Sequence, residues 1–216
     1  MPDNYVVQQG DHLSKIAKEN GFTNYSVIWD HPQNAELKKL RKNPNVLLPG
    51  DQIYIPDMEM KEESGATNHR HTFVVDKKPL KLKLVLEDAY EKPIAGAQCA
   101  LLVDGQPFQV TTDGNGGLEQ EIRLDAKAAW LTIRGDQTPL AGETIAIKIG
   151  HLDPIDSPSG QVARLNNLGY FAGALDGSDS DALESAIEEF QCDHGLTVSG
   201  DCDSQTQAKL QQVHGC

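Results

Sequence analysis

Residues 165–177, LNNLGYFAGALDG, decide the fold of the end of this chain together with residues 186–200, AIEEFQCDHGLTVSG. The first stretch completes a short helix that ends at Gly169, and a glycine-rich turn follows it. Apolar residues then recur every three or four positions through the second stretch, which is the period of an amphipathic helix. A third helix is expected over 204–213. We therefore predict a compact three-helix bundle over residues 160–216.

The spacing of these residues resembles the peptidoglycan-binding domain found beside many cell-wall hydrolases. Residues 165–177 match its L-x-x-L-G-Y-x-x-G-x-x-D-G pattern, residues 186–200 match A-x-x-x-F-Q-x-x-x-G-L-x-x-x-G, and residues 206–210 match T-x-x-x-L. The resemblance implies wall binding. Its candidate contact residues are Tyr170, Asp176 and Gln191. The alternative is that Tyr170 belongs to the core and Asp176 holds a turn.

Two positions in this segment depart from the family pattern. Ser178-Asp179-Ser180 replaces an aromatic-glycine pair, and Asp203 stands where glycine is usual. Ser180 or Asp181 is the expected N-cap of the second helix. The surface that would meet a stem peptide is therefore expected to be unusually acidic.

The beginning of the chain predicts a strand, a helical region and a second strand. A β-prone run at 5–7 precedes a helix in which Leu13 and Ile16 share one face, and Asp11 is its expected N-cap. Further helical stretches are expected over 25–30 and 34–42, before a strand at 52–55. The predicted order is βααβ.

This segment resembles a LysM domain at both of its ends, YVVQQGDHLSKIAKENG at 5–21 and NPNVLLPGDQIYIP at 43–56. The resemblance implies a shallow groove that binds glycans containing N-acetylglucosamine, through backbone hydrogen bonds and apolar contact. The candidate groove residues are Gly10, Asp11, His12, Leu13, Asn45, Val46, Leu47 and Leu48. His12 replaces the usual Thr or Ser, and the alternative reading is a LysM fold used only for docking.

Residues 72–150 change to the alternating pattern of β-strands. LKLKLVL at 80–86 at first alternates apolar and basic residues, and five further short strands follow, separated by glycine-rich turns. We predict an antiparallel β-sandwich, and the segment resembles carboxypeptidase-regulatory-like and other Ig-like domains, which are mostly spacers or docking surfaces. Asp113 and Asn115 offer oxygen ligands for calcium, although a glycine-rich hairpin explains them more simply.

Polar, unpatterned stretches separate these segments. The predicted organisation is a multidomain α+β protein. Its parts are a LysM domain at 1–57, a linker at 58–71, an Ig-like sandwich at 72–150, a linker at 151–159 and the helical domain at 160–216.

Charge and hydropathy narrow the function classes. The net charge is −13, and residues 158–216 carry 9 acidic against 2 basic residues. Nucleic-acid and anionic-membrane partners need Lys/Arg clusters, so we expect neither. No apolar run is long enough for membrane insertion and no secretory signal is visible, so we expect synthesis in the cytoplasm and action in the periplasm or envelope, or delivery by an injection machine.

Three of the four cysteines fall in the helical segment. A Cys192–Cys202 disulfide would close the loop between its second and third helices and stabilise it by about 2–3 kcal/mol in an oxidising compartment. These cysteines with His194, His214 and Cys216 are the alternative, a zinc site, although their spacing matches no standard zinc motif.

The sequence shows no nucleophile–base pair or metal triad, so we expect a non-catalytic peptidoglycan-binding protein without cofactors. Its expected partners are N-acetylglucosamine glycan and wall stem peptide. Residues 43–56 and FQCDHGLTVSGDC at 190–202 also resemble proteins encoded with type VI secretion or phage-tail-like contractile injection machines. The alternative that this resemblance implies is an accessory, cargo or adaptor protein of such a system, docked on the spike protein. A cell-wall hydrolase is the third reading.

Overall fold

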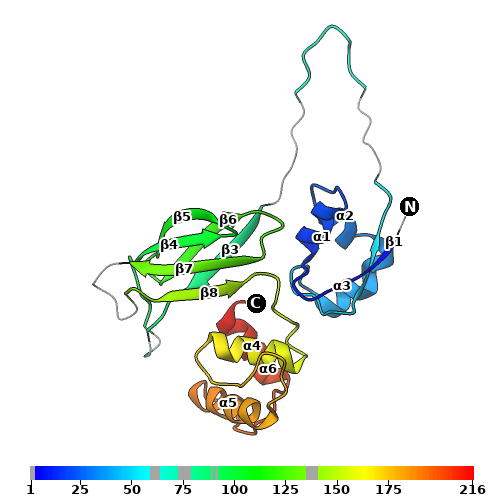
Figure 1. The fold of residues 1–216 in the computed structure, drawn as a ribbon. Coiled ribbons are helices and arrows are strands. Elements are labelled where there is room, and N and C mark those ends of the chain that lie inside the picture. Colours follow the sequence, from blue (N-terminus) through cyan, green and yellow to red (C-terminus); the bar gives the residue numbers. More distant parts are fainter. Residues whose placement is uncertain (1–2, 59–63, 73–78, 89, 91, 135–140) are drawn as a thin grey trace. The chain divides into compact units, whose positions relative to one another are not determined.

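The computed structural model describes residues 3–58, 64–72, 79–88, 90, 92–134 and 141–216. The chain divides into two compact units, residues 1–151 and 152–216, and it combines helices with antiparallel sheets (Figure 1). The predicted α+β class is confirmed. Residues 59–63 of the first predicted linker, 58–71, lie outside the described residues.

The first unit begins with the predicted order of strand, helices and strand. These elements are β1 (Asp3–Val6), α1 (Leu13–Glu19), α2 (Ser26–Trp29), the 3-10 helix η1 (Pro32–Asn34), α3 (Ala35–Arg41) and β2 (Gln52–Ile55). β1 and β2 pair antiparallel with Tyr5 opposite Ile53. Leu13, Ile16 and Ile28 are fully buried beneath them, so the amphipathic face of α1 forms the core of this segment.

The expected N-cap of α1 is wrong by one residue. His12, not Asp11, has the extended conformation of a cap, and its Nδ1 accepts from the backbone N–H of Lys15 at 3.4 Å. Asp11 instead turns its carboxylate back toward the first strand, where Tyr5 donates to it. Both Asp11 and His12 have side chains that can cap a helix. Asp11 is bonded to Tyr5 of the first strand, and His12 therefore acts as the cap.

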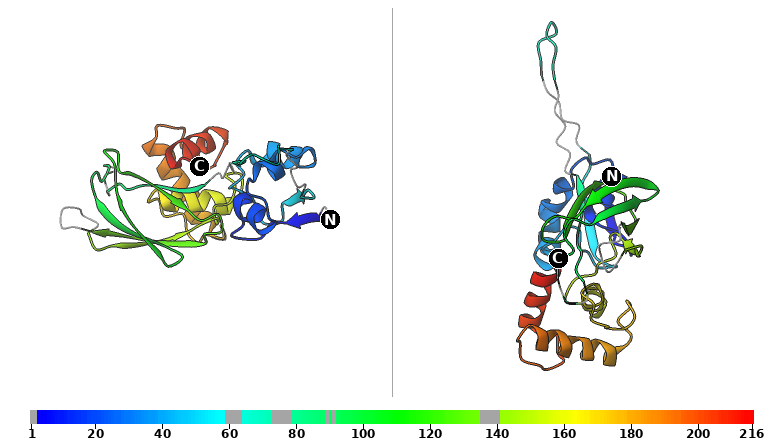
Figure 2. Two further views of the ribbon diagram at one scale, coloured as in Figure 1. Left: turned by 90° about the horizontal axis from the view of Figure 1, so that it is seen from above. Right: turned by 90° about the vertical axis from the view of Figure 1, so that its left-hand side faces the viewer.

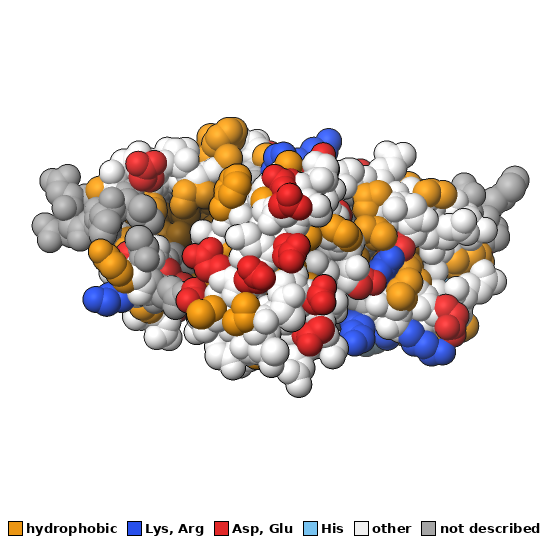
Figure 3. Space-filling model, turned by 90° about the horizontal axis from the view of Figure 1, so that it is seen from below, with side chains coloured by type: hydrophobic (Ala, Val, Ile, Leu, Met, Phe, Trp, Pro, Cys, Tyr) orange, Lys and Arg blue, Asp and Glu red, His pale blue; other side chains and the backbone are white. Residues whose placement is uncertain are grey.

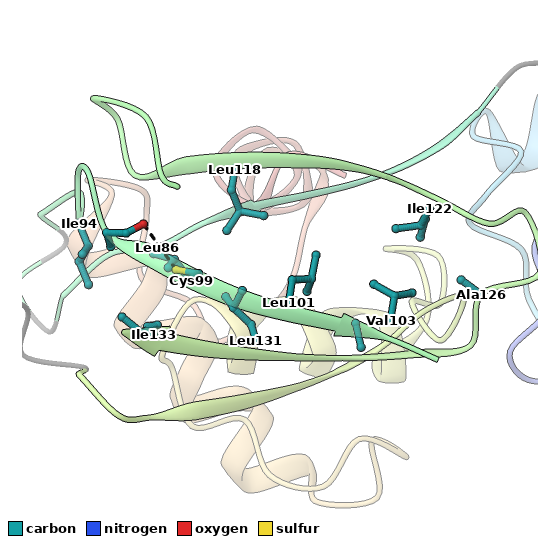
Figure 4. Close-up of a cluster of buried hydrophobic side chains, with 12 residues drawn as sticks. Leu86, Ile94, Cys99, Leu101, Val103, Leu118, Ile122, Ala126, Leu131 and Ile133 are labelled. Carbon is teal, nitrogen blue, oxygen red and sulfur yellow. Dashed lines mark hydrogen bonds between the residues drawn. The ribbon is translucent and has the colours of Figure 1, made fainter. Parts of the chain in front are cut away.

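The described residues in the second part of this unit form six strands, as the sequence predicts. They are β3 (Leu80–Val85), β4 (Gln98–Val103), β5 (Gln106–Thr111), β6 (Gly117–Ile122), β7 (Ala128–Arg134) and β8 (Thr144–Lys148). β3 pairs with β6, and a four-stranded antiparallel sheet has the order β5-β4-β7-β8. Both sheets contribute to one core, in which Leu118 and Ile122 lie opposite Leu101 and Leu131 (Figure 4).

Residues 152–216 form a helical unit with its own core. Its helices are α4 (Pro158–Asn167), α5 (Ser180–Asp193) and α6 (Ser204–His214), drawn yellow to red in Figure 2. The core is built from apolar side chains of all three helices and the loop after α4. Its buried members are Val162, Leu165, Tyr170, Ala172, Ala186, Ile187, Phe190 and Leu210.

Side-chain caps define where these helices begin. Ser157, Asp179 and Asp203 each accept from a backbone N–H in the first turn of α4, α5 and α6 respectively. The expected cap of α5, Ser180 or Asp181, is therefore wrong by one residue. Asp203 replaces the glycine of the family pattern with a favourable N-cap.

Buried Arg164 ties the segment before α4 to the helices. It is 1% exposed and donates to the backbone oxygens of Asp153 at 2.8 Å and Gly160 at 2.7 Å. Gly160 packs so closely on the backbone of Pro154 that a Cβ would clash there. The chain from Asp153 onward is thus part of the helical unit, and α4 begins two residues before the predicted domain boundary at 160.

Candidate functional site

Gln191 organises the loop between α5 and α6. Its side chain is 1% exposed, and its Oε1 accepts from the backbone N–H groups of Ser199 at 2.8 Å and Gly200 at 3.2 Å. Its Nε2 donates to the backbone oxygen of Asp201 and the hydroxyl of Thr206. The hydrogen-bonding groups of the Gln191 amide are therefore used within the protein, and they stabilise the loop between α5 and α6.

Tyr170 and Asp176 also have structural partners. Tyr170 is 7% exposed, packs edge-on against Phe190 with ring centroids 5.5 Å apart, and donates its hydroxyl to Asp193 at 3.2 Å. Asp176 is exposed and accepts from the backbone N–H of Ser178 at 3.0 Å. Hydrogen bonding to Ser178 lowers the pKa of this carboxyl. Only Asp176 of the three predicted contact residues presents its polar group at the surface.

The same loops expose large apolar side chains that the sequence patterns did not single out. Phe171 is 79% exposed, Leu175 52% and Val198 54%. Asn166 pins the backbone beside Phe171, because it accepts from Ala172 N–H at 2.9 Å and donates to the Gly173 oxygen at 3.0 Å. The available signal was an aromatic residue at a variable position inside the family motif, directly after Tyr170.

The outward side of α5 is strongly acidic. Its carboxylates gather over this helix on the face drawn in Figure 3. The exposed residues are Asp181, Glu184, Glu188, Glu189 and Asp193. The sequence predicts an unusually acidic surface in this segment. The structure has these acidic side chains on α5, the helix after the loop that carries Phe171 and Leu175.

All four cysteines are free thiols. The predicted Cys192–Cys202 bridge is not formed in the structure and stays a prediction for the oxidised protein. Burial raises the pKa of Cys202 to about 11, so this thiol is protonated at neutral pH. Among the described residues, no group of three His, Cys, Asp or Glu side chains could hold a metal ion.

The fold brings the two halves of the candidate N-terminal groove together. The backbone N–H of Leu13 donates to the Pro44 oxygen at 3.1 Å, and Ser14 donates to the side chain of Asn45 at 3.3 Å. Segments more than thirty residues apart in sequence therefore meet at the start of α1.

Most predicted groove side chains are nevertheless buried. Leu13 and Leu47 belong to the core, and Val46 is 8% exposed. Gly10, Asn45 and Leu48 remain partly exposed. The exposed part of this edge consequently consists of backbone and the side chains of Asn45 and Leu48, and Leu13 and Leu47 pack in the core below it.

Asp11 and His12 form the buried polar centre of this turn. The Asp11 carboxylate accepts from Tyr5 at 2.6 Å and from the Lys15 ammonium at 2.7 Å. Burial alone would raise the pKa of Asp11, but hydrogen bonds from Lys15 and Tyr5 lower it overall. Burial lowers the pKa of His12 to about 4, so the imidazole is neutral at pH 7.

Asp113 and Asn115, the calcium candidates, lie in a tight hairpin. Asp113 accepts from the backbone N–H groups of Asn115 at 2.8 Å and Gly117 at 2.9 Å. The turn explains the aspartate without a cation.

A family described as "Putative peptidoglycan binding domain" matches residues 162–210. No curated protein and no solved structure gives a match. The matched residues span α4 to α6 and lie within the compact unit 152–216. The chain therefore carries a peptidoglycan-binding domain, which supports a role at the cell wall. In the part of the chain that is described, no helix is both long and apolar enough to cross a membrane.

Proposed function

We propose that this protein binds peptidoglycan without cleaving it, holding the wall through residues 152–216 and the glycan strand through the N-terminal turn. The observation that carries the proposal is the family match at 162–210, which coincides with a unit that has its own core. Wall binding fits action in the cell envelope.

In the C-terminal unit, the proposed contact surface is the loop between α4 and α5. Phe171 and Leu175 are exposed there, while the buried Tyr170 holds the loop in place. An exposed aromatic ring on a pinned backbone supplies contact area at little cost in conformational entropy. Asp176 adds a carboxylate on the same loop.

At the N-terminus, the proposed glycan contacts are the partly exposed Gly10, Asn45 and Leu48. Backbone groups and one apolar side chain suit acetamido groups and sugar faces. The support is the LysM resemblance together with the contact between Leu13 and Pro44 that joins the two segments. Two weak sites in one chain would raise avidity for a repeating polymer by effective concentration.

Co-sedimentation of the full chain with insoluble peptidoglycan tests this function. Phe171→Ser and Leu175→Ser should weaken binding. Val85→Ser is the matched control, because Val85 in β3 is an apolar residue whose exposure, 63%, lies between those of Phe171 and Leu175. Each contact should contribute up to about tenfold in affinity. Soluble muropeptides are measured in the same tubes.

Binding without muropeptide release supports the proposal. Release above the protein-free control would make the protein a hydrolase. Failure to sediment would reject wall binding and favour the reading in which these domains dock on a secretion spike, to be checked by co-purification with that spike.

A further inference from the structure

The outer face of the sheet β5-β4-β7-β8 carries an apolar row that crosses all four strands. Strand register places Pro107, Leu102, Trp130 and Ala146 next to one another in that order. Trp130 is 51% exposed and Leu102 39%. Their neighbours along the strands, such as Leu101 and Leu131, point into the core (Figure 4), so alternation fixes this row on the outside.

Short neutral side chains lie beside the apolar row. The adjacent row across the sheet is Gln109, Ala100, Thr132 and Thr144. The hydroxyls of Thr132 and Thr144 are 3.0 Å apart and bond to each other. The Thr132 hydroxyl thus lies next to the indole along β7, and the Gln109 amide lies on β5, on the far side of β4; both groups can donate and accept hydrogen bonds.

The charge of this face differs from that of the whole chain. The outward positions of its paired strands hold no carboxylate, and their charged residues are Arg134 and Lys148. The net charge of the protein is −13. The outer face of β3 and β6, by contrast, carries Lys81 and Lys83 paired with Glu119.

We propose that this face, which we call the Trp130 face, is a saccharide platform that binds a β-linked N-acetylhexosamine strand. The inference rests on the proposed wall binding and adds a site to it. An indole presents a flat apolar surface to the C–H face of a pyranose ring, and the flanking Thr and Gln side chains reach hydroxyl and acetamido groups. Four strands spaced about 4.8 Å apart give a platform roughly 14 Å wide, enough for two or three sugar rings.

A second copy of the chain fits this face less well. Stable dimers bury roughly 20–30 residues on each partner, far more than one row of four apolar side chains. Two chains of net charge −13 also repel each other. A neutral sugar strand needs no such large contact area and is not repelled by the negative charge of the chain.

The chain has two tryptophans, so ligand binding at the Trp130 face can be followed by tryptophan fluorescence. Trp29 is 7% exposed and Trp130 51%, so added quencher reports mainly on Trp130. Titration of the full chain with the N-acetylglucosamine tetramer should shift the emission to the blue and reduce acrylamide quenching about twofold, because the ring becomes covered. Trp130→Ala should abolish both responses.

A matched pair of variants separates binding from folding. Ala146→Arg places a long charged side chain beside Trp130 and should weaken the tetramer by about tenfold or more. Val85→Arg makes a comparable change on the opposite face and should leave the titration unchanged. Circular dichroism verifies that both variants keep the wild-type fold.

Three results would overturn the proposal. One is an unchanged emission on titration of the wild type, and another is a response that persists in Trp130→Ala. The third is a molar mass by light scattering that falls from dimer to monomer in Trp130→Ala, since the face would then be a self-interface. Sedimentation with peptidoglycan is run in parallel, so that a chain that sediments without a tryptophan response rejects this site alone, while a response without sedimentation rejects the proposed wall binding alone.

Discussion

The helical unit 152–216 and the Trp130 face differ in how sequence pattern relates to exposure. In the helical unit, two of the three residues that the family pattern singles out, Tyr170 and Gln191, are buried and bonded internally, and only Asp176 is exposed. On the Trp130 face, the exposed ring belongs to no motif. A recurrent pattern therefore identifies residues that specify the fold, whereas contact residues must be found from exposure.

The largest expected effect is in the helical unit. Gln191→Ala removes the acceptor of two backbone N–H groups in the loop at 199–200 and should lower the free energy of unfolding by about 2–4 kcal/mol. Urea unfolding followed by circular dichroism measures it. Gln212→Ala, an exposed glutamine on α6, is the control. A Gln191 variant of wild-type stability that no longer binds the wall would return this residue to the contact surface.

Acid should destabilise the helical unit 152–216 but not the strands of residues 79–150. Burial, and to a lesser extent the charge of Arg164, lowers the pKa of His214 to about 4 from the usual 6.5. The unfolded chain then binds a proton that the folded unit does not, so stability is full above pH 6.5 and is lost as the pH falls toward 4, by up to about 3 kcal/mol. Residues 79–150 contain no histidine and should not share this loss.

Amide hydrogen exchange at pH 7 and pH 5 resolves the two regions in one sample. The protection of α4 to α6 should fall relative to that of β4 and β7. His214→Gln should remove the difference between the two pH values. An equal loss in both regions would contradict the assignment to His214.

Tyr170→Phe should have a moderate effect, because it keeps the ring against Phe190 and removes one hydrogen bond to Asp193. The expected cost is about 1 kcal/mol, with wall binding retained. Thermal unfolding and sedimentation with peptidoglycan measure the two quantities. Lost binding at unchanged stability would show that the hydroxyl contacts the ligand.

The smallest effect on stability is expected at Trp130. Trp130→Ala should change the free energy of unfolding by less than about 1 kcal/mol, because half of the side chain is already in water. Leu131→Ala, the next residue and 0% exposed, should cost about 2–5 kcal/mol. Similar losses for the two would mean that Trp130 serves the fold and would weaken the proposed platform.

Periodicity predicted the elements well. The alternation in 80–86 and the later strand candidates correspond to β3 to β8, and the helical spacing after Leu13 and Ala186 corresponds to α1 and α5. The caps were harder to place, since Asp11 and Ser180 have the right chemistry one residue from the true cap. Side chains of similar capping ability stand side by side there, and only their long-range partners distinguish them.

By itself, the sequence determined the order of the strands and helices, the peptidoglycan-binding pattern of 162–210 and the acidic charge of the chain, because each follows from local spacing and composition. Tertiary structure decided which of those residues face water. It buried Gln191 under a loop and Leu47 in a core, and it aligned Trp130 with Leu102 and Pro107. Register between strands distant in sequence sets that alignment, and no local pattern encodes it.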